Sequence, residues 1–224
     1  MSSCIDHLII TAPSLESGAA FVCRTLGVVP QIGGKHPRMG THNLLLRLGE
    51  GVFLEVIAVD PAAPVPGRPR WFGLDRLGSD APPMLAGWVA RTDRIWATAA
   101  AASDDLGIVE PMSRGALNWH ITLPADGKLP LQGAGPALIE WQTPAHPAAM
   151  LDDLGLSLAG LDIFHPQQER ILRLLHTIDF DGPLAVWPLA ASARPYLVAR
   201  INTPHGLCEL RSGPSTSAPF SSPH

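Results

Sequence analysis

Two polar side chains in apolar segments carry the clearest chemical information in this sequence. Glu55 lies in the apolar run 52–58, and His7 lies in the β-branched run 5–11. An unpaired buried carboxylate is costly, so Glu55 needs either a partner such as Arg47 or a place on the exposed side of a strand. His7 also fits a core histidine that is hydrogen-bonded to a neighbouring strand. Together, an imidazole and a carboxylate are suitable ligands for Zn²⁺, Fe²⁺, Mn²⁺ or Ni²⁺.

A second set of polar residues follows a glycine-rich stretch. The segment 40–43 reads Gly-Thr-His-Asn and leads into an apolar run. A turn that delivers His42 and Asn43 to the start of a strand could place a general base and an amide donor at the rim of a pocket. The same residues also fit a turn in which Thr41 and Asn43 satisfy local backbone groups. His42 is the candidate proton-transfer residue of this sequence.

Arg114 is the third chemical candidate. It lies beside a glycine in the segment 112–120. A guanidinium near a pocket can form paired hydrogen bonds with a carboxylate, an enolate or a phosphate. The alternative is a solvated loop charge. No serine nucleophile elbow, P-loop or dinucleotide fingerprint is present, and the scattered cysteines are expected to be reduced core residues without a catalytic role, namely Cys4, Cys23 and Cys208.

The order of predicted elements repeats along the chain. A strand over 5–11 precedes a helix that begins after Ser14 and ends at Gly27, where a left-handed residue is favoured. Three further strands complete a βαβββ unit. The same order returns twice, which predicts an α+β protein with a first module at 1–60, a Pro-rich connector packing near the site at 61–86, a second module at 87–145, a third, divergent module at 156–212 and a disordered tail at 213–224.

Composition limits the classes of function. The 224 residues are 46% hydrophobic and carry a net charge of -4, which indicates a folded protein with a sizeable core. No cluster of basic residues favours nucleic acid as a partner. No apolar run reaches the length of a membrane span, and no secretory signal is recognisable, so we expect a cytoplasmic protein that does not bind membranes.

Four segments resemble a glyoxalase-like domain of the vicinal-oxygen-chelate superfamily. They are 5–10 (IDHLII), 40–47 (GTHNLLLR), 53–57 (FLEVI) and 70–75 (RWFGLD). The resemblance implies βαβββ modules that form a cupped mixed sheet with helices outside. It leaves the reaction open, because this superfamily includes isomerases, lyases, dioxygenases, epimerases and drug-sequestering proteins.

The resemblance also implies a metal site built from the first and last strand of each module. His7 and Glu55 match these positions in the first module, and Glu140 matches the last-strand carboxylate of the second. Trp88 stands where a second histidine is expected. The implied ligand set is therefore His7, Glu55 and Glu140, which leaves coordination positions open for substrate. Whether Glu209 of the third module contributes is left open.

Two hypotheses follow. The first is a divalent-metal-dependent enzyme of lyase, isomerase or dioxygenase type that binds a small organic substrate through vicinal oxygens, with His42 moving a proton and Asn43, Trp88 and Arg114 shaping the pocket. The second is a metal-free protein that binds or sequesters a small molecule between tryptophan side chains. Three modules cannot all pair within one chain, which suggests either a homodimer or a module used as a lid.

Overall fold

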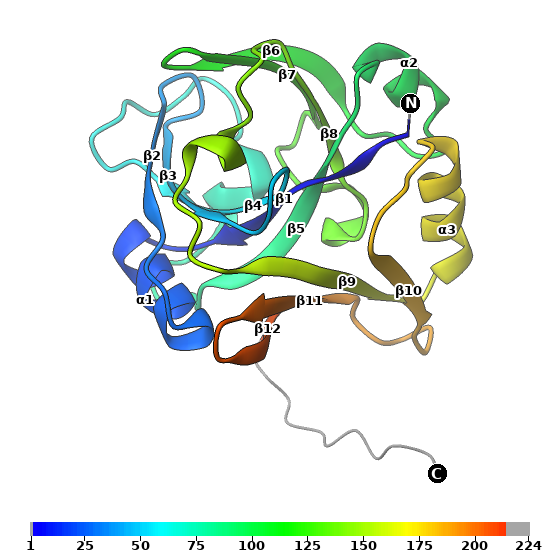
Figure 1. Ribbon diagram of the computed structural model, residues 1–224. Helices are drawn as coiled ribbons and strands as arrows, with labels where there is room; N and C mark the ends of the chain where they lie inside the picture. The colour runs from blue at the N-terminus through cyan, green and yellow to red at the C-terminus, as the bar shows by residue number, and fades with distance from the viewer. Residues whose placement is uncertain (1, 214–224) are drawn as a thin grey trace.

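The computed structural model describes residues 2–213, which form two β-sheets and three α-helices (Figure 1). The larger sheet has eight strands in the order β2-β3-β4-β1-β5-β8-β7-β6, and the smaller has four in the order β10-β9-β11-β12. The predicted α+β class with a cupped mixed sheet is confirmed. No described helix has the length and apolarity needed to cross a membrane. The predicted disordered tail lies outside the described residues except for Gly213.

The first half of the large sheet is one βαβββ unit. The helix is N-capped by Ser14 in a capping box with Ser17 and ends at Gly27 with a φ of 75°, as expected. The first strand pairs in parallel with the last one of the unit. The elements are β1 (Cys4–Thr11), α1 (Leu15–Leu26), β2 (Gln31–His36), β3 (Thr41–Arg47) and β4 (Phe53–Val59).

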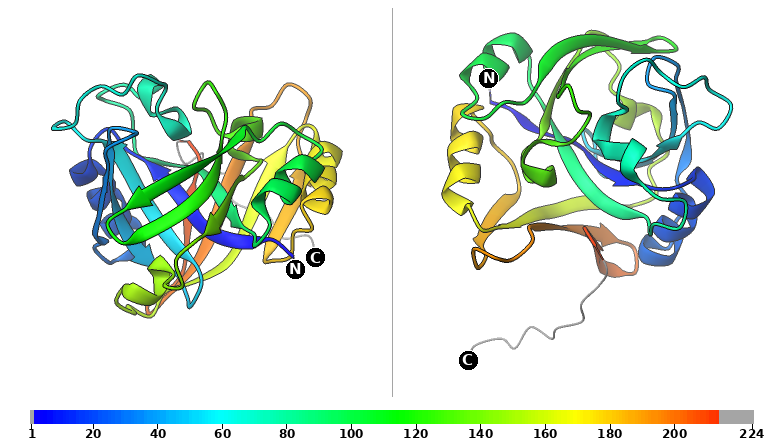
Figure 2. Two further views of the ribbon diagram at one scale, coloured as in Figure 1. Left: turned by 90° about the horizontal axis from the view of Figure 1, so that it is seen from above. Right: turned by 180° about the vertical axis from the view of Figure 1, so that it is seen from behind.

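The second half repeats this strand order, and the antiparallel pairing of β1 with β5 joins the halves. Its elements are β5 (Met84–Arg91), α2 (Ile95–Ala101), β6 (Ile108–Arg114), β7 (Leu117–Leu123) and β8 (Ala137–Trp141). Although β2 and β6 lie at opposite ends of the strand order, Arg38 on the loop after β2 donates to the carbonyl of Pro111 on β6 at 2.9 Å. The sheet therefore curls into a cup (Figure 2).

The last part of the chain keeps the βαβββ element order but not the strand order. Its first strand lies between the second and third strands of the unit, paired in parallel with one and antiparallel with the other. The four strands of this part form a separate sheet, which covers the outer face of the cup between α1 and α3 (Figure 1). The elements are β9 (Ser157–His165), α3 (Gln168–Thr177), β10 (Leu184–Pro188), β11 (Tyr196–Thr203) and β12 (Gly206–Arg211). The three-part division of the chain remains a proposal.

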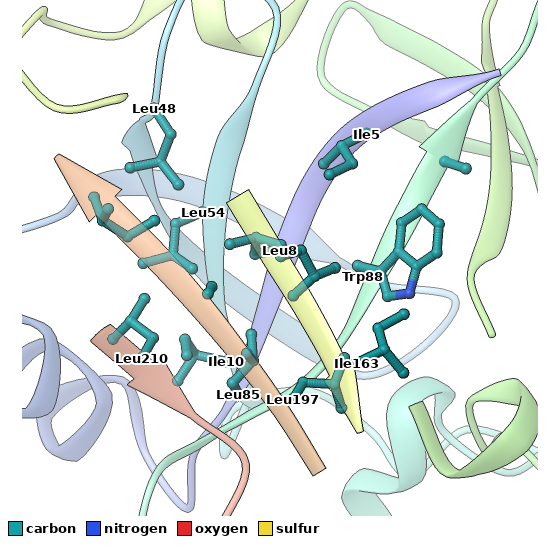
Figure 3. Packing of buried hydrophobic residues seen from close by; sticks show 14 of the residues in the cluster. Ile5, Leu8, Ile10, Leu48, Leu54, Leu85, Trp88, Ile163, Leu197 and Leu210 are labelled. Atoms are coloured by element: carbon teal, nitrogen blue, oxygen red, sulfur yellow. The ribbon is translucent and has the colours of Figure 1, made fainter. Parts of the chain in front are cut away.

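Strand alternation divides the buried side chains between two faces of the large sheet. Leu8 and Ile10 of β1 point outward and pack against Ile163 and Leu197 of the covering sheet (Figure 3). Ile9 points into the cup.

The connector crosses this inner side as a short 3₁₀ helix, Trp71–Arg76, and buries Trp71 and Leu74 against the inner cluster. The other 3₁₀ segments are Pro130–Gly133 and Pro147–Met150.

Leu197→Ala tests whether the covering sheet is part of the main core. Leu197 is 2% exposed, so its truncation should lower the free energy of unfolding by about 2–5 kcal/mol. The matched control is Leu207→Ala in the same sheet, because Leu207 is 59% exposed. Urea denaturation measures both. Equal, small losses in the two variants would contradict the packing described here.

Candidate functional site

A buried carboxylate positions the first site residue, His7. Asp6 is 0% exposed and lies at an irregularity in the pairing of β1 with β5. Its Oδ1 is 2.7 Å from His7 Nδ1, and its Oδ2 accepts from Trp141 Nε1 at 2.9 Å, His146 Nε2 at 3.0 Å and Arg91 Nη1 at 3.4 Å. Burial alone would raise the pKa of Asp6, but the hydrogen bonds and charges of His146 and His7 hold it well below its ordinary value.

The ionised Asp6 determines which ring nitrogen of His7 carries a proton. An ionised carboxylate only accepts hydrogen bonds, so Nδ1 of His7 carries the proton. In the neutral ring Nε2 then has a free lone pair. This atom faces the inside of the cup, 3.7 Å from Glu55 Oε2. His7 is thus held as a base or ligand, stacked on Phe53 with ring centroids 4.5 Å apart.

Glu55 finds its partner on the neighbouring strand. Its Oε1 accepts from Asn43 Nδ2 at 2.5 Å, and Asn43 Oδ1 in turn accepts from the Gly34 amide at 2.8 Å. Arg47, the partner considered from the sequence, instead donates to the Gly49 carbonyl. Asn43 therefore orients Glu55 and offsets part of the cost of burying it.

His36 and Arg114 face this group from the edge strands of the two halves. Arg114 Nη1 lies 3.4 Å from His36 Nε2, and His36 Nδ1 lies 3.2 Å from Thr41 Oγ1. Burial, together with the Arg114 charge, lowers the pKa of His36 to about 3. Burial also lowers the pKa of Arg114, while the Glu55 charge acts in the opposite direction. The pair therefore combines a neutral imidazole with a guanidinium, which stays protonated in proteins.

These groups enclose a cavity of about 30 Å³, room for about one water molecule. Its walls are largely aromatic, and two of the lining side chains, Trp71 and Phe72, come from the connector. A ligand much larger than a water molecule therefore requires some of the lining side chains to move. The lining residues are His7, His36, Phe53, Glu55, Trp71, Phe72, Arg114, Trp119, Ile121, Ile139 and Trp141.

The structure brings together four of the residues singled out from the sequence: His7, Glu55, Asn43 and Arg114. It does not bring His42 to them. On β3, Asn43 points into the cup, and the pairing of His42 with Ala58 continues the outward row that includes Leu44 and Val56. His42 is thus on the outer face, away from the cavity.

Glu140 and Trp88 also lie away from the cavity. Glu140 Oε2 accepts from the Ile95 amide at the start of α2 at 2.8 Å, so this carboxylate caps a helix on the outside. Trp88 is fully buried in the outer core, where its Nε1 donates to the Ala134 carbonyl at 3.1 Å. Neither faces the inside of the cup, because side chains alternate along a strand and the neighbouring residues, Val89 on β5 and Ile139 on β8, point inward. Glu209 is paired with Arg211 on the covering sheet.

The sequence interpretation missed Asp6, His36 and His146. Asp6 did carry a signal, because an acid beside a histidine in an apolar run needs buried partners. His36 lay in a glycine-rich segment without periodicity, and His146 reaches Asp6 from the loop after β8, 140 residues further along the chain. No local spacing pattern identifies the latter two.

The donor set does not fit the implied divalent ion. Within residues 2–213, no group of three His, Cys, Asp or Glu side chains is close enough to hold a metal. His7 and Glu55 are a pair, whereas the inward positions opposite them on β5 and β8 are Val89 and Ile139, which donate nothing. Arg114 adds a positive charge to the same cavity.

Comparisons with known proteins agree on the fold. A family model described as a glyoxalase-like domain matches residues 5–196. A hypothetical protein from Staphylococcus aureus is similar in structure, with a TM-score of 0.60, 11% identity and coverage of 84% of this chain and 87% of that one.

Two further solved structures score lower. One is Streptomyces coelicolor methylmalonyl-CoA epimerase in complex with 2-nitronate-propionyl-CoA, with a TM-score of 0.41, 19% identity and coverage of 62% and 94%. The other is a methylmalonyl-CoA epimerase in complex with methylmalonyl-CoA, with a TM-score of 0.43, 19% identity and coverage of 66% and 100%. Among curated proteins there is no significant match.

His36 predicts a pH dependence of stability. In the unfolded chain His36 binds a proton below its ordinary pKa of 6.5, whereas in the folded protein it stays neutral down to about pH 3. The free energy of unfolding therefore decreases as the pH falls from 6.5 to 3. Between pH 7 and pH 5 this amounts to about 2 kcal/mol. His36→Gln should therefore lose about that much less stability than the wild type over this interval.

Urea denaturation at the two pH values measures this difference. His205→Gln, at an exposed histidine, is the matched control and should behave like the wild type. If His36→Gln loses as much stability as the wild type, His36 is not held neutral in the fold.

Proposed function

Because the chain belongs to the glyoxalase-like domain family, we propose that its cup binds a small carbonyl- or carboxylate-bearing molecule and transfers a proton at it. The observation that carries this proposal is the orientation of His7. Asp6 holds its Nδ1 at 2.7 Å, so the free Nε2 points into a buried cavity that Arg114 also lines. A base and a cation in one desolvated space are suited to removing a proton next to a carbonyl.

Each polar residue then has a distinct part. His7 Nε2 takes the proton, and the carboxylates of Asp6 and Glu55 stabilise the imidazolium that forms. The Arg114 guanidinium donates to the oxygen on which negative charge develops. Asn43 keeps Glu55 oriented toward His7, and the aromatic lining, which includes Trp71 and Phe72, limits the access of water to the site.

A resident divalent metal is not part of this proposal. His7 and Glu55 supply two donors, and the inward residues of the facing strands β5 and β8 supply none. The positive charge of Arg114 in the same cavity disfavours the binding of a second cation. The guanidinium instead provides the positive charge that a metal would bring to a substrate oxygen.

A second candidate is a protein that sequesters a small molecule in the cup. The observation in its favour is the aromatic lining, in which Trp119 and Trp141 lie 5.4 Å apart between ring centroids and Trp71 stacks on Phe72. Such walls bind planar apolar ligands without chemistry. Tight binding without any proton exchange would favour this candidate over the enzyme.

The first prediction from this proposal concerns metal content. Protein purified without chelator should carry far less than one equivalent of Zn, Fe, Mn or Ni, and His7→Ala and Glu55→Ala should carry the same small amount as the wild type. Mass spectrometry of the metals measures this. Near-stoichiometric metal that disappears in both variants would contradict the proposal and restore the metal-dependent enzyme.

The second prediction concerns proton exchange. In D₂O, the wild type should speed deuterium uptake at the carbon next to the carbonyl of at least one member of a panel of 2-oxo acids and 1,3-dicarbonyl compounds, followed by proton NMR. His7→Gln should slow it by about 100-fold or more, the usual contribution of a positioned base.

His205→Gln is again the matched control and should exchange at the wild-type rate. Undiminished exchange in His7→Gln would exclude His7 as the base. Binding of panel members without exchange in the wild type would favour the sequestering protein.

A further inference from the structure

A second and much larger pocket lies outside the cup. We call it the outer pocket; its volume is about 840 Å³, within the range of ligand sites. It forms where the end of β1 at Thr11 and the start of β5 at Met84 meet the 3₁₀ helix of the connector and the covering sheet. The small sheet, which adds nothing to the cup, therefore supplies one wall of this pocket.

The lining of the outer pocket combines an apolar floor with positive charge. Leu74 and Leu85 are buried in its floor. Three arginines line it and no acidic residue does. Arg76 and Arg194 are exposed, and neither forms an ion pair with any residue in 2–213, whereas Arg211 pairs with Glu209 at 2.6 Å. In a protein with a net charge of -4, such a concentration of unpaired arginines favours an anion.

The outer pocket and the cavity of the cup share one lining residue, Phe72. Phe72 stacks on Trp71 with ring centroids 5.4 Å apart. Its φ is 58°, a left-handed conformation that is strained for a bulky residue, and Gly73 follows with a φ of 71°. Such strain is typical of segments that clamp or admit ligands.

We propose that the outer pocket binds the anionic end of an extended amphipathic molecule, a carboxylate or phosphate carried on an apolar body, whose other end reaches the cup past Phe72. The arginines bind the anion, and the leucine floor binds the apolar part. The binding of the anion stands on the outer pocket alone, while the identification of this molecule as the substrate rests on the function proposed above. The covering sheet thus becomes a determinant of ligand choice.

Two fluorescent probes with the same aromatic body separate charge from apolar contact. They are 8-anilino-1-naphthalenesulfonate and its neutral analogue N-phenyl-1-naphthylamine. In the double variant Arg76→Gln and Arg194→Gln, the affinity for the sulfonate should fall by about tenfold or more, since both charged donors are lost. The affinity for the neutral probe should change by less than about twofold. Equal changes for the two probes would overturn the proposal.

Arg173→Gln is the matched control, since Arg173 is an exposed arginine on α3, outside the outer pocket and without an ion pair among the described residues. It should leave both affinities unchanged. Octanoate and octyl phosphate should compete with the sulfonate probe, and the stronger competitor identifies the preferred anion. Failure of both to compete would contradict an anion site of this kind.

Two measurements separate this inference from the proposed proton transfer. His7→Gln should leave probe affinity unchanged, because His7 lines the cavity of the cup and not the outer pocket. Loss of affinity in His7→Gln with retention in the arginine variant would place the probe in the cup and overturn the inference, while leaving the proposed proton transfer unaffected.

Intermolecular NOEs from the alkyl end of decanoate to Phe72 and Trp141 test whether the ligand extends from the outer pocket into the cup. NOEs confined to the outer pocket would contradict this extension.

Discussion

The buried charge of Asp6 is the constraint on which the rest of the site depends. A carboxylate without solvent exposure is stable only when donors surround it, and Asp6 has four of them. They come from β1 itself, from Arg91 on β5, from Trp141 on β8 and from His146 in the loop beyond. Both halves of the cup must be in place before Asp6 is satisfied. The orientation of His7 is therefore a consequence of the whole sheet.

The sequence predicted the type and order of elements because these follow local patterns. Apolar runs, the Ser14 cap and Gly27 indicated the βαβββ unit, and the isolated acid in the run 52–58 indicated a buried partner for Glu55. The face of each strand was harder to predict. His42 and Asn43 are neighbours, as are Trp88 and Val89, and Ile139 and Glu140, so in each pair one residue faces the cup and the other the outer core. Choosing between them requires the register of strands that are distant in sequence.

The third part of the chain illustrates a second limit. Its element order matches that of the other two, but strand order is a matter of tertiary packing and cannot be read from element order. The first strand, β9, pairs with β10 and β11, and the resulting sheet covers the outward row that contains Leu8, Ile10 and Trp88. The outer face of the cup is apolar, and a sheet rather than a partner module shields it. This packing also explains why Trp88 is a core residue.

The central claim is that the contact with Asp6 fixes a proton on Nδ1 of His7, so that in the neutral ring the lone pair of Nε2 is directed into the cup. Long-range ¹H–¹⁵N NMR of the histidine side chains measures this tautomer directly. We predict the Nδ1–H form for His7 in the wild type and its loss in Asp6→Ala, with the His205 signals unchanged. A neutral His7 that carries its proton on Nε2 in the wild type would contradict the account, because the base proposed for the site would then have no lone pair facing the cavity.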